Sequence, residues 1–405
     1  MKKDFFFVAL AGFFISCTIF FSGCSYSTDD NLKHEELFTL NYGNFEDQLN
    51  FFTSENNTFG YDAHITMNDG LIYTSNSAGQ KILKTSSYGD LLSVYYNPET
   101  NPTPTFLSES NEEEEISTRQ AIKHLFNSCT FLSVSNSKHL YVVDTVPNER
   151  IEFDNDENIA LKNIVLHFNS EGRFTNYIGQ EGLEGTPFAN ISSIHTNADN
   201  EVIIISKTLS AVKVFWYTEN GDLLYKIPIM LNMLPSPYDV SVNVDMNVDS
   251  VVPSYDKKEL YIKIDYYAEM IDSESGAGIG TNYDKSSIYR LSLNTAKYTH
   301  IRDIAPFIGT ETDSNGTAIE VPRIYSMIGM AMSKWCFLLV TQNKGYALML
   351  LNLKDGKKYN FDLEIAPENT VYNTFTVTNT GQLVALLAGD EKASIYVWHT
   401  ENFIK

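Results

Sequence analysis

Short apolar runs alternate with tight polar turns along most of this chain. Between residues 163 and 228 there are six such runs, each four to six residues long and rich in β-branched and aromatic side chains. Gly, Asn and Asp separate them, and this pattern predicts antiparallel β-hairpins without helix. The runs are Ile164–Phe168, Phe174–Ile178, Ile191–His195, Val202–Ile205, Val212–Tyr217 and Leu223–Ile227.

The pattern repeats along the chain. A turn followed by an apolar strand occurs six times, with a mean spacing of about 62 residues. A bare four-stranded propeller blade needs about 40–50 residues, so the repeats are predicted to carry insertions. The six strands after these turns begin near Leu71, Leu140, Val202, Leu260, Phe337 and Leu383.

The last repeat lacks one strand, and the segment before the first repeat can supply it. A second turn, between the third and fourth strands of a repeat, occurs only five times, and the chain ends soon after Ala393–Trp398. Leu37–Leu40 is a spare strand that could pair with it and close a ring without free edges. We therefore predict a six-bladed β-propeller over residues 37–405. A β-sandwich or two all-β domains is the alternative, although no Pro-, Gly- or Ser-rich linker divides the chain.

The first 23 residues have the pattern of a signal peptide. Lys2 and Lys3 precede the apolar run Phe5–Phe21, and small residues stand before Cys24. We predict a signal peptide over residues 1–23 and a flexible polar tether over residues 24–36. An uncleaved transmembrane anchor is the alternative, but the apolar run is short for a membrane span.

Two segments resemble known families. Phe21-Ser22-Gly23-Cys24 resembles the lipobox of bacterial lipoproteins, in the looser form seen in spirochaetes. This resemblance implies cleavage before Cys24, acylation of Cys24 and anchoring in the cell envelope, in either membrane. A glycine-punctuated stretch resembles the NHL-type propeller repeat, and both features together are similar to a group of spirochaete lipoproteins with six-bladed propellers. That resemblance implies fold, location and a binding role only; it rests on Gly179, Gly182, Gly185, Phe188, Ile191 and Asp199-Asn200.

The charge of the chain is unevenly distributed. The formal net charge of −22 argues against a nucleic-acid partner and against adhesion to anionic lipid. Strand alternation places the four long insertions on one face, which holds 19 acidic and 6 basic side chains. These insertions are residues 97–128, 145–162, 266–285 and 303–324. The face is predicted either to bind a basic partner or simply to provide solubility. Its densest run is Glu112, Glu113, Glu114 and Glu115, which should lead into a short amphipathic helix with Ile116, Ile122, Leu125 and Phe126 on one side.

Candidate chemistry is sparse. His64 and His195 should occupy equivalent positions on inner strands, facing the channel, but the equivalent positions in the other blades offer no third ligand for zinc. These positions are Ser133, Pro253, Met330 and Thr376. Asp239, Asp245 and Asp249 are clustered in sequence but match no calcium loop, so solvated turns are expected. The glycine-rich stretch Ser275–Gly280 is predicted to be a mobile loop, and no hydrolase, zinc-protease or P-loop motif is present.

The remaining cysteines and the partners complete the sequence-based picture. Cys129 and Cys336 should lie in opposite blades, too far apart for a disulfide, as buried free thiols.

We expect a monomeric, lipid-anchored scaffold without a metal or cofactor that binds a protein or peptide through its acidic loop face. The alternatives are an envelope hydrolase or lyase with a metal in the channel, and a purely structural envelope protein.

Overall fold

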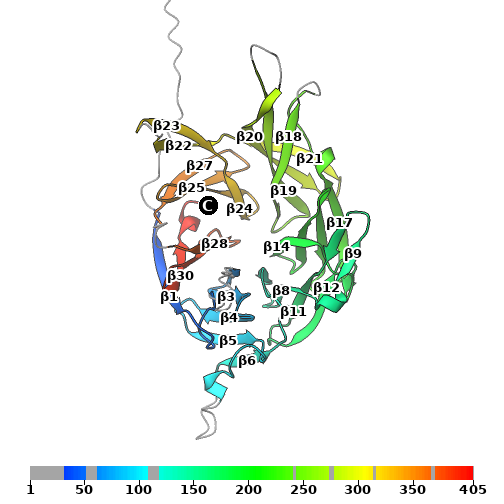
Figure 1. Cartoon of the computed structure of the whole chain (residues 1–405), viewed down its shortest axis with the longest axis vertical. Helices are drawn as coiled ribbons and strands as arrows, with labels where there is room; N and C mark the ends of the chain where they lie inside the picture. The colour runs from blue at the N-terminus through cyan, green and yellow to red at the C-terminus, as the bar shows by residue number, and fades with distance from the viewer. Residues whose placement is uncertain are drawn as a thin grey trace, which may run out of the picture.

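Six small, mainly antiparallel sheets surround a central axis in the computed structural model (Figure 1). The structure describes residues 32–51, 62–107, 118–239, 243–272, 278–312, 316–365 and 370–404. The chain is a six-bladed β-propeller, as the sequence predicted. The signal peptide, Cys24 and the run Glu112–Glu115 lie outside the described residues. No helix in the described ranges is both long enough and apolar enough to cross a bilayer.

Blades 1 and 2 have five strands each. Blade 1 contains β2 (Ala63–Asn68), β3 (Leu71–Asn76), β4 (Lys81–Ser86), β5 (Leu91–Tyr96) and β6 (Gln120–Lys123). Blade 2 contains β7 (Leu132–Val134), β8 (Leu140–Thr145), β11 (Asn163–Phe168), β12 (Phe174–Gly179) and β13 (Gly182–Leu183).

Blades 3, 4 and 5 have four strands each, and their strands follow one another in sequence from the axis outward. Blade 3 contains β14 (Asn190–Thr196), β15 (Val202–Lys207), β16 (Ala211–Tyr217) and β17 (Leu223–Met230). Blade 4 contains β18 (Val244–Pro253), β19 (Glu259–Ile271), β20 (Gly278–Ser292) and β21 (Lys297–Ile304). Blade 5 contains β24 (Ser326–Ala331), β25 (Trp335–Gln342), β26 (Gly345–Asn352) and β27 (Lys358–Leu363).

The two ends of the chain together form blade 6, which confirms the predicted closure. Its strands are β28 (Tyr372–Val377), β29 (Leu383–Ala388), β30 (Lys392–Trp398) and β1 (His34–Asn41). β1 runs antiparallel to β30, with Leu40 opposite Ala393 and His34 opposite Trp398. The strand therefore begins three residues before the predicted start, inside the predicted tether. Its charged side chains are exposed, which an outer edge strand tolerates.

Short elements connect the blades. Two hairpins stand apart from them: β9 (Glu152–Asp154) with β10 (Ile159–Leu161), and β22 (Phe307–Thr312) with β23 (Ala318–Arg323). The 3₁₀ turns of the described chain are η1 (Thr105–Leu107), η3 (Asn148–Arg150), η4 (Leu231–Met233) and η6 (Thr400–Asn402).

Apolar side chains fill each of the six junctions between neighbouring blades. Successive residues of a strand point to opposite sides of its sheet. In β15, Val202 and Ile204 pack against blade 2, whereas Ile203 and Ile205 pack against blade 4. Both faces of each inner sheet are thus buried, which explains why the second strands read as continuous apolar runs.

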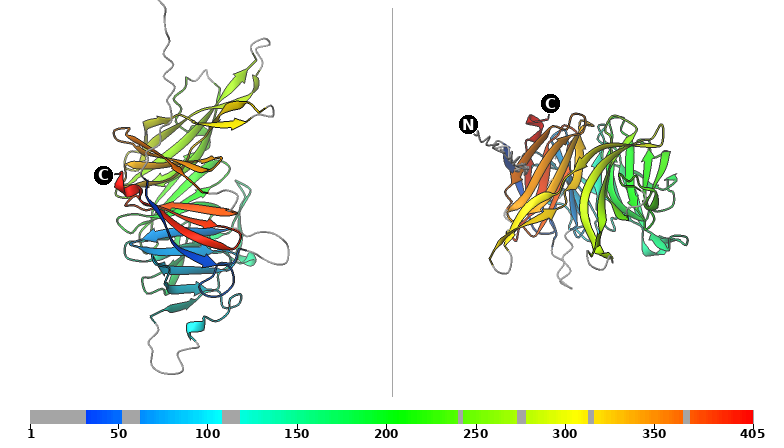
Figure 2. Two further views of the ribbon diagram at one scale, coloured as in Figure 1. Left: turned by 90° about the vertical axis from the view of Figure 1, so that its left-hand side faces the viewer. Right: turned by 90° about the horizontal axis from the view of Figure 1, so that it is seen from above.

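The two faces of the ring differ in their connections. Turns between first and second strands and between third and fourth strands lie on one face, which also carries the C-terminal turn η6; we call this the tight-turn face. The other face, the insertion face, carries β9–β10, β22–β23 and the far end of the β19–β20 hairpin (Figure 2). The predicted one-sided placement of the insertions is therefore seen in their described parts.

Hydrogen bonds between turns link neighbouring blades on the tight-turn face. The Asn68 side chain donates to the Val134 carbonyl at the first junction (3.2 Å). The Asn136 amide donates to Oδ1 of Asn200 at the second (2.9 Å). The next three junctions are joined in the same way, by Ala198 N–H to Tyr255 O, Tyr255 N–H to Ser333 Oγ and Met332 N–H to Asn379 O.

The predicted amphipathic helix after Glu115 is wrong over its described part. Gln120–Lys123 is strand β6, which pairs parallel to β5 along the outer edge of blade 1. Ile122 packs into the core between blades 1 and 2, Phe126 is buried there, and Leu125 is exposed. Pairing with an open sheet edge satisfies the backbone of this segment, and local periodicity could not reveal that edge.

Candidate functional site

The central channel is a cavity of about 470 Å³ that all six inner strands line. His64, His195 and the four positions paired with them in the sequence analysis are all among its lining residues. The rest of the wall is mostly hydroxyl, amide and apolar groups. Among the described residues that line the channel, Asp69 carries the only carboxylate. The channel is therefore far less charged than the insertion face.

The two histidines lie at different depths, so their predicted equivalence is wrong. His195 pairs with Ile203, the second residue of its neighbouring strand, whereas His64 pairs with Ser75, the fifth residue of its own. The reason is turn length: two residues separate β2 from β3, but five separate β14 from β15. Three residues of extended chain correspond to about 10 Å along the channel. Opposite the second residue of each blade's second strand, the inner strands place Met67, Ser133, His195, Pro253, Met330 and Thr376.

Each histidine has partners of its own. His64 Nε2 lies 2.9 Å from Asp62 Oδ1, and its ring packs on Phe131 with centroids 4.1 Å apart. His195 Nε2 lies 3.1 Å from Ser193 Oγ. Burial lowers the pKa of His195 to about 4, so this imidazole is neutral at pH 7. A neutral imidazole can ligate a metal. The residues paired with His195 in the other blades, however, supply neither a second imidazole nor a carboxylate as a further ligand. Within the described ranges, no three His, Cys, Asp or Glu side chains are placed to share a metal ion.

Side chains partly close the channel at the tight-turn face. The Asn136 carboxamide of blade 2 donates to the Tyr255 hydroxyl of blade 4 (2.9 Å), across the intervening turn of blade 3. Both residues line the channel.

The three aspartates near β18 do not form a calcium site. Asp239 and Asp245 are exposed, but Asp249 faces blade 5 from a bulge in β18. The fully buried Lys263 ammonium lies 2.5 Å from Asp265 Oδ1 and 3.5 Å from Asp249 Oδ2. The expectation of solvated turns is thus wrong for Asp249, because a buried lysine needs carboxylate partners.

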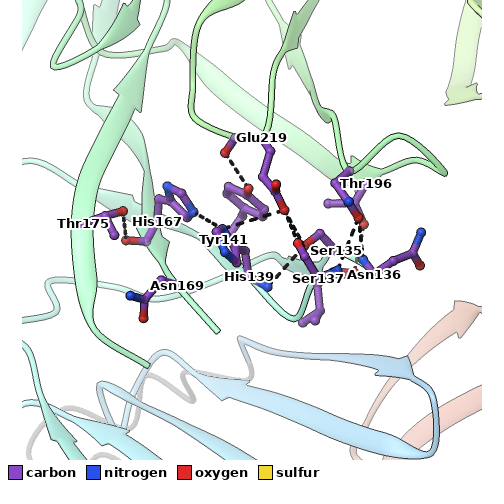
Figure 3. Close-up of polar contacts among 12 residues, drawn as sticks. Ser135, Asn136, Ser137, His139, Tyr141, His167, Asn169, Thr175, Thr196 and Glu219 are labelled. Carbon is purple, nitrogen blue, oxygen red and sulfur yellow. Dashed lines mark hydrogen bonds and ion pairs between the residues drawn. The ribbon is translucent and has the colours of Figure 1, made fainter. Parts of the chain in front are cut away.

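A histidine pair at the boundary of blades 2 and 3 was not found from the sequence (Figure 3). His139 Nδ1 and His167 Nε2 are hydrogen-bonded at 2.8 Å, and the His167 ring stacks on Tyr141 at 4.6 Å. Glu219 reaches over from blade 3, accepts from Ser137 and lies 3.9 Å from His139. Burial, and then the neighbouring His139, lower the pKa of His167 to about 4.

The hairpin register could have found this pair. Phe168 lies opposite Leu140, so His139 and His167 are diagonal neighbours across β8 and β11. The β9–β10 insertion separates these two strands by 17 residues and hid the pairing. The cluster joins two blades through their turns, so its geometry indicates a structural contact.

On the insertion face, the described parts of three of the four predicted insertions form β-hairpins. β19 and β20 continue into the third segment as far as Ile271 and Gly278, so part of the predicted mobile glycine loop is strand. Large apolar side chains are exposed on these hairpins, including Phe153, Ile271 and Ile279.

The two internal cysteines are buried free thiols, as predicted. Cys129 precedes β7 in blade 2, and Cys336 lies in β25 of blade 5. Burial raises the pKa of both thiols, and the nearby Asp144 raises that of Cys129 further. Neither thiol is therefore suited to act as a nucleophile near neutral pH.

Comparisons with known proteins give no family. No family model matches the chain, and no curated protein matches it either. Among solved structures, an ulvan lyase of polysaccharide lyase family 25 is 9% identical, with a TM-score of 0.39, over 90% of this chain and 84% of that one. The β-propeller domain of the trilobed protease from Pyrococcus furiosus is 9% identical, with a TM-score of 0.40, over 84% and 95%.

A gluconolactonase from Xanthomonas campestris is 11% identical, with a TM-score of 0.36, over 81% of this chain and 82% of that one. The activities of these proteins differ from one another. At such low identities and scores, none of those activities extends to this chain. The function must therefore be argued from this chain's own residues.

Proposed function

We propose that the protein is a lipid-anchored bacterial envelope protein whose propeller is a non-enzymatic scaffold for a basic protein or peptide. The observation that carries this proposal is the division between the two faces of the ring. The described insertions gather on one face, and the chain enters β1 at the other (Figure 2). Loops positioned by a rigid scaffold are where binding functions concentrate.

The point at which the chain enters the propeller supports a particular orientation of the ring relative to the membrane. β1 begins at His34 opposite Trp398, and the Lys33 carbonyl accepts from the His399 amide beside the C-terminal turn. Ten residues, Cys24 to Lys33, would link the lipid to this point, and they span at most roughly 35 Å. With Cys24 acylated, the tight-turn face would be held near the membrane and the insertion face would point away from it.

Charge supports the choice of partner. The four insertion segments carry 19 acidic and 6 basic residues. Such a surface attracts a basic partner and speeds encounter at low ionic strength. A channel-based hydrolase or lyase has less support, because the described channel lining holds two histidines at different depths and one carboxylate, and no three ligating side chains lie together there.

Charge reversal tests the scaffold proposal. Changing Glu112, Glu113, Glu114 and Glu115 to Lys should abolish low-salt capture of a basic partner by the purified protein, because attraction becomes repulsion. Capture should be measured by quantitative pull-down at low and high salt. Four exposed acids in turns of the tight-turn face make a matched control, in which reversal should leave capture intact: Asp90, Glu171, Asp222 and Asp355. An unchanged set of captured proteins in the Glu112–Glu115 variant would contradict the proposal.

The anchor is tested separately. Cys24→Ser should release the protein from the membrane fraction and remove incorporation of a labelled fatty acid. Two or more acyl chains hold a protein stably to a bilayer, so the shift should be nearly complete. Membrane association of Cys24→Ser equal to that of the wild type would remove the lipoprotein part of the proposal.

A further inference from the structure

A second cavity, a groove of about 490 Å³, lies on the rim of the ring at blade 6. Its volume is within the range of ligand sites in proteins. It is separate from the central channel and shares no lining residue with it. Its floor is one face of β30, the strand that β1 covers on its outer edge (Figure 1).

One half of the groove has an aromatic floor. Tyr396, Trp398 and His34 lie together, with ring centroids 5.9 Å apart for the Tyr–Trp pair and 6.0 Å for the His–Trp pair. Ser394 and Tyr396 are half-buried, whereas Ile395 on the other face of the strand is completely buried against blade 1. On this face of β30, Lys392, Ser394 and Tyr396 therefore lack full cover from blade 5, whereas Trp398 is buried against it.

The other half of the groove is acidic. Glu364, Asp390 and Glu391 line it and are exposed, and Lys392 is the one basic residue that lines it among the described residues. The formal charge of this end is two negative units. Asp390 and Glu391 belong to the turn between β29 and β30, so this end opens on the insertion face.

The spacing of the two halves indicates an extended ligand. Lys392 and Tyr396 are four positions apart on β30, which corresponds to about 13 Å along the strand. A peptide lying along the strand would place side chains four residues apart over the two ends. In peptide-binding grooves, pockets for alternate side chains give specificity, and charge complementarity adds to it.

We infer that this groove binds an extended basic peptide, with an aromatic or aliphatic side chain on the Tyr396–Trp398 floor and a Lys or Arg at the acidic end. This inference rests on the proposed function and assigns a binding site to its basic partner. The chain's own segment after Cys24 is a poor occupant, because it carries Asp29 and Asp30 beside no basic residue before Lys33. The groove thus extends the acidic insertion face down the side of the ring.

A labelled peptide tests the inference directly. The probe has tryptophan at one end and two lysines at the other, separated by three serines, and is made in both directions. Fluorescence anisotropy at low salt should show saturable binding to the full chain in one direction. Replacing the tryptophan by alanine, or both lysines by glutamate, should weaken binding at least about fivefold.

Variants locate the site. Asp390→Asn combined with Glu391→Gln, and separately Tyr396→Ala, should each weaken probe binding by about fivefold or more. Glu152→Gln combined with Asp154→Asn removes two charges from the β9–β10 hairpin and should leave affinity within about twofold. Melting temperatures of all variants should match the wild type, which separates lost contacts from unfolding. For a destabilised Tyr396→Ala protein, Tyr396→Leu keeps an apolar floor and should bind a version of the probe with leucine in place of tryptophan.

The outcomes separate this inference from the proposed function. Absence of probe binding to the wild type, or equal binding by the groove variants, overturns the inference. If partner capture still depends on Glu112–Glu115 in that case, the scaffold proposal stands without the groove. If neither the probe nor any basic partner binds, both fail.

Discussion

The two faces of this propeller have different connections and different chemistry. On the tight-turn face, turns of two to five residues are joined across blades by hydrogen bonds, such as Asn136 N–H to Asn200 Oδ1. On the insertion face, hairpins extend beyond the blades and carry exposed carboxylates and apolar groups. The first face therefore adds polar contacts between blades to the apolar junctions, whereas the second presents exposed hairpins to its surroundings.

The two faces exist only when β1 closes the ring. Loss of this closure should therefore have the largest effect on the free energy of unfolding. Leu40→Asp places a charge in the buried core between blades 6 and 1, where Leu40 is 5% exposed. The free energy of unfolding should fall by about 3–5 kcal/mol. Urea unfolding followed by tryptophan fluorescence measures this.

The neighbouring residue provides the control. Thr39 is exposed on the same strand, so Thr39→Asp should cost less than about 0.5 kcal/mol. Equal losses in the two variants would mean that β1 does not bury its apolar face in blade 6.

Asp144 supports the segment of the insertion face that precedes β7, and its removal should have an intermediate effect. The buried Asp144 carboxylate accepts backbone N–H groups of Asn127, Ser128, Cys129 and Thr145, at 2.6–3.3 Å. Asp144→Ala leaves these donors unpaired and should cost about 2–4 kcal/mol. Asp144→Asn keeps one acceptor oxygen and should cost less.

The pH dependence of stability sharpens this prediction. Burial raises the pKa of Asp144 to about 6, partly offset by the backbone hydrogen bonds. A raised carboxyl pKa contributes stability that is fully present below the unfolded value near 4 and is lost as the pH rises through about 6. Unfolding free energies measured from pH 4 to 7 should show this loss in the wild type and not in Asp144→Asn. Parallel curves for the two proteins would show that Asp144 does not titrate in this window.

Removal of a hairpin from the insertion face should have the smallest effect. The Val146 amide donates to the Lys162 carbonyl, so a two-residue Asn-Gly turn can replace residues 147–161 between them. The loss includes the ion pair between Lys213 and Glu157, at 2.6 Å, and should amount to about 1 kcal/mol. A loss above about 3 kcal/mol in urea unfolding would mean that the insertions hold the ring together after all.

Local sequence signals predicted the architecture but not the depth of residues within it. Asn68-Asp69-Gly70 and its five counterparts marked the turns, and the vacancy in the last blade was correctly assigned to the segment at Leu40. The misplacement of His64 shows the limit of counting residues between repeats. Turn length differs from blade to blade, and an extended chain moves about 3.3 Å per residue.

Contacts between distant segments were beyond the reach of the sequence. The strand at Gln120–Lys123 forms because the edge of β5 is open, and the buried Lys263 is tolerated because Asp249 and Asp265 meet it from two strands. The aromatic half of the rim groove brings together residues more than 350 positions apart, since His34 stacks on Trp398. None of these pairings leaves a periodic signal in either segment alone.

The sequence by itself determined the number of blades, the closing strand and the side of the ring on which the insertions lie. It did so because turn residues and strand alternation are local properties, governed by backbone conformation and by the two-residue period of a strand. The tertiary structure decided which polar groups meet: the histidine pair, the buried lysine and the groove on blade 6. These contacts depend on the strand register and turn lengths of every blade. A polar group that becomes buried also requires a hydrogen-bond or ion-pair partner.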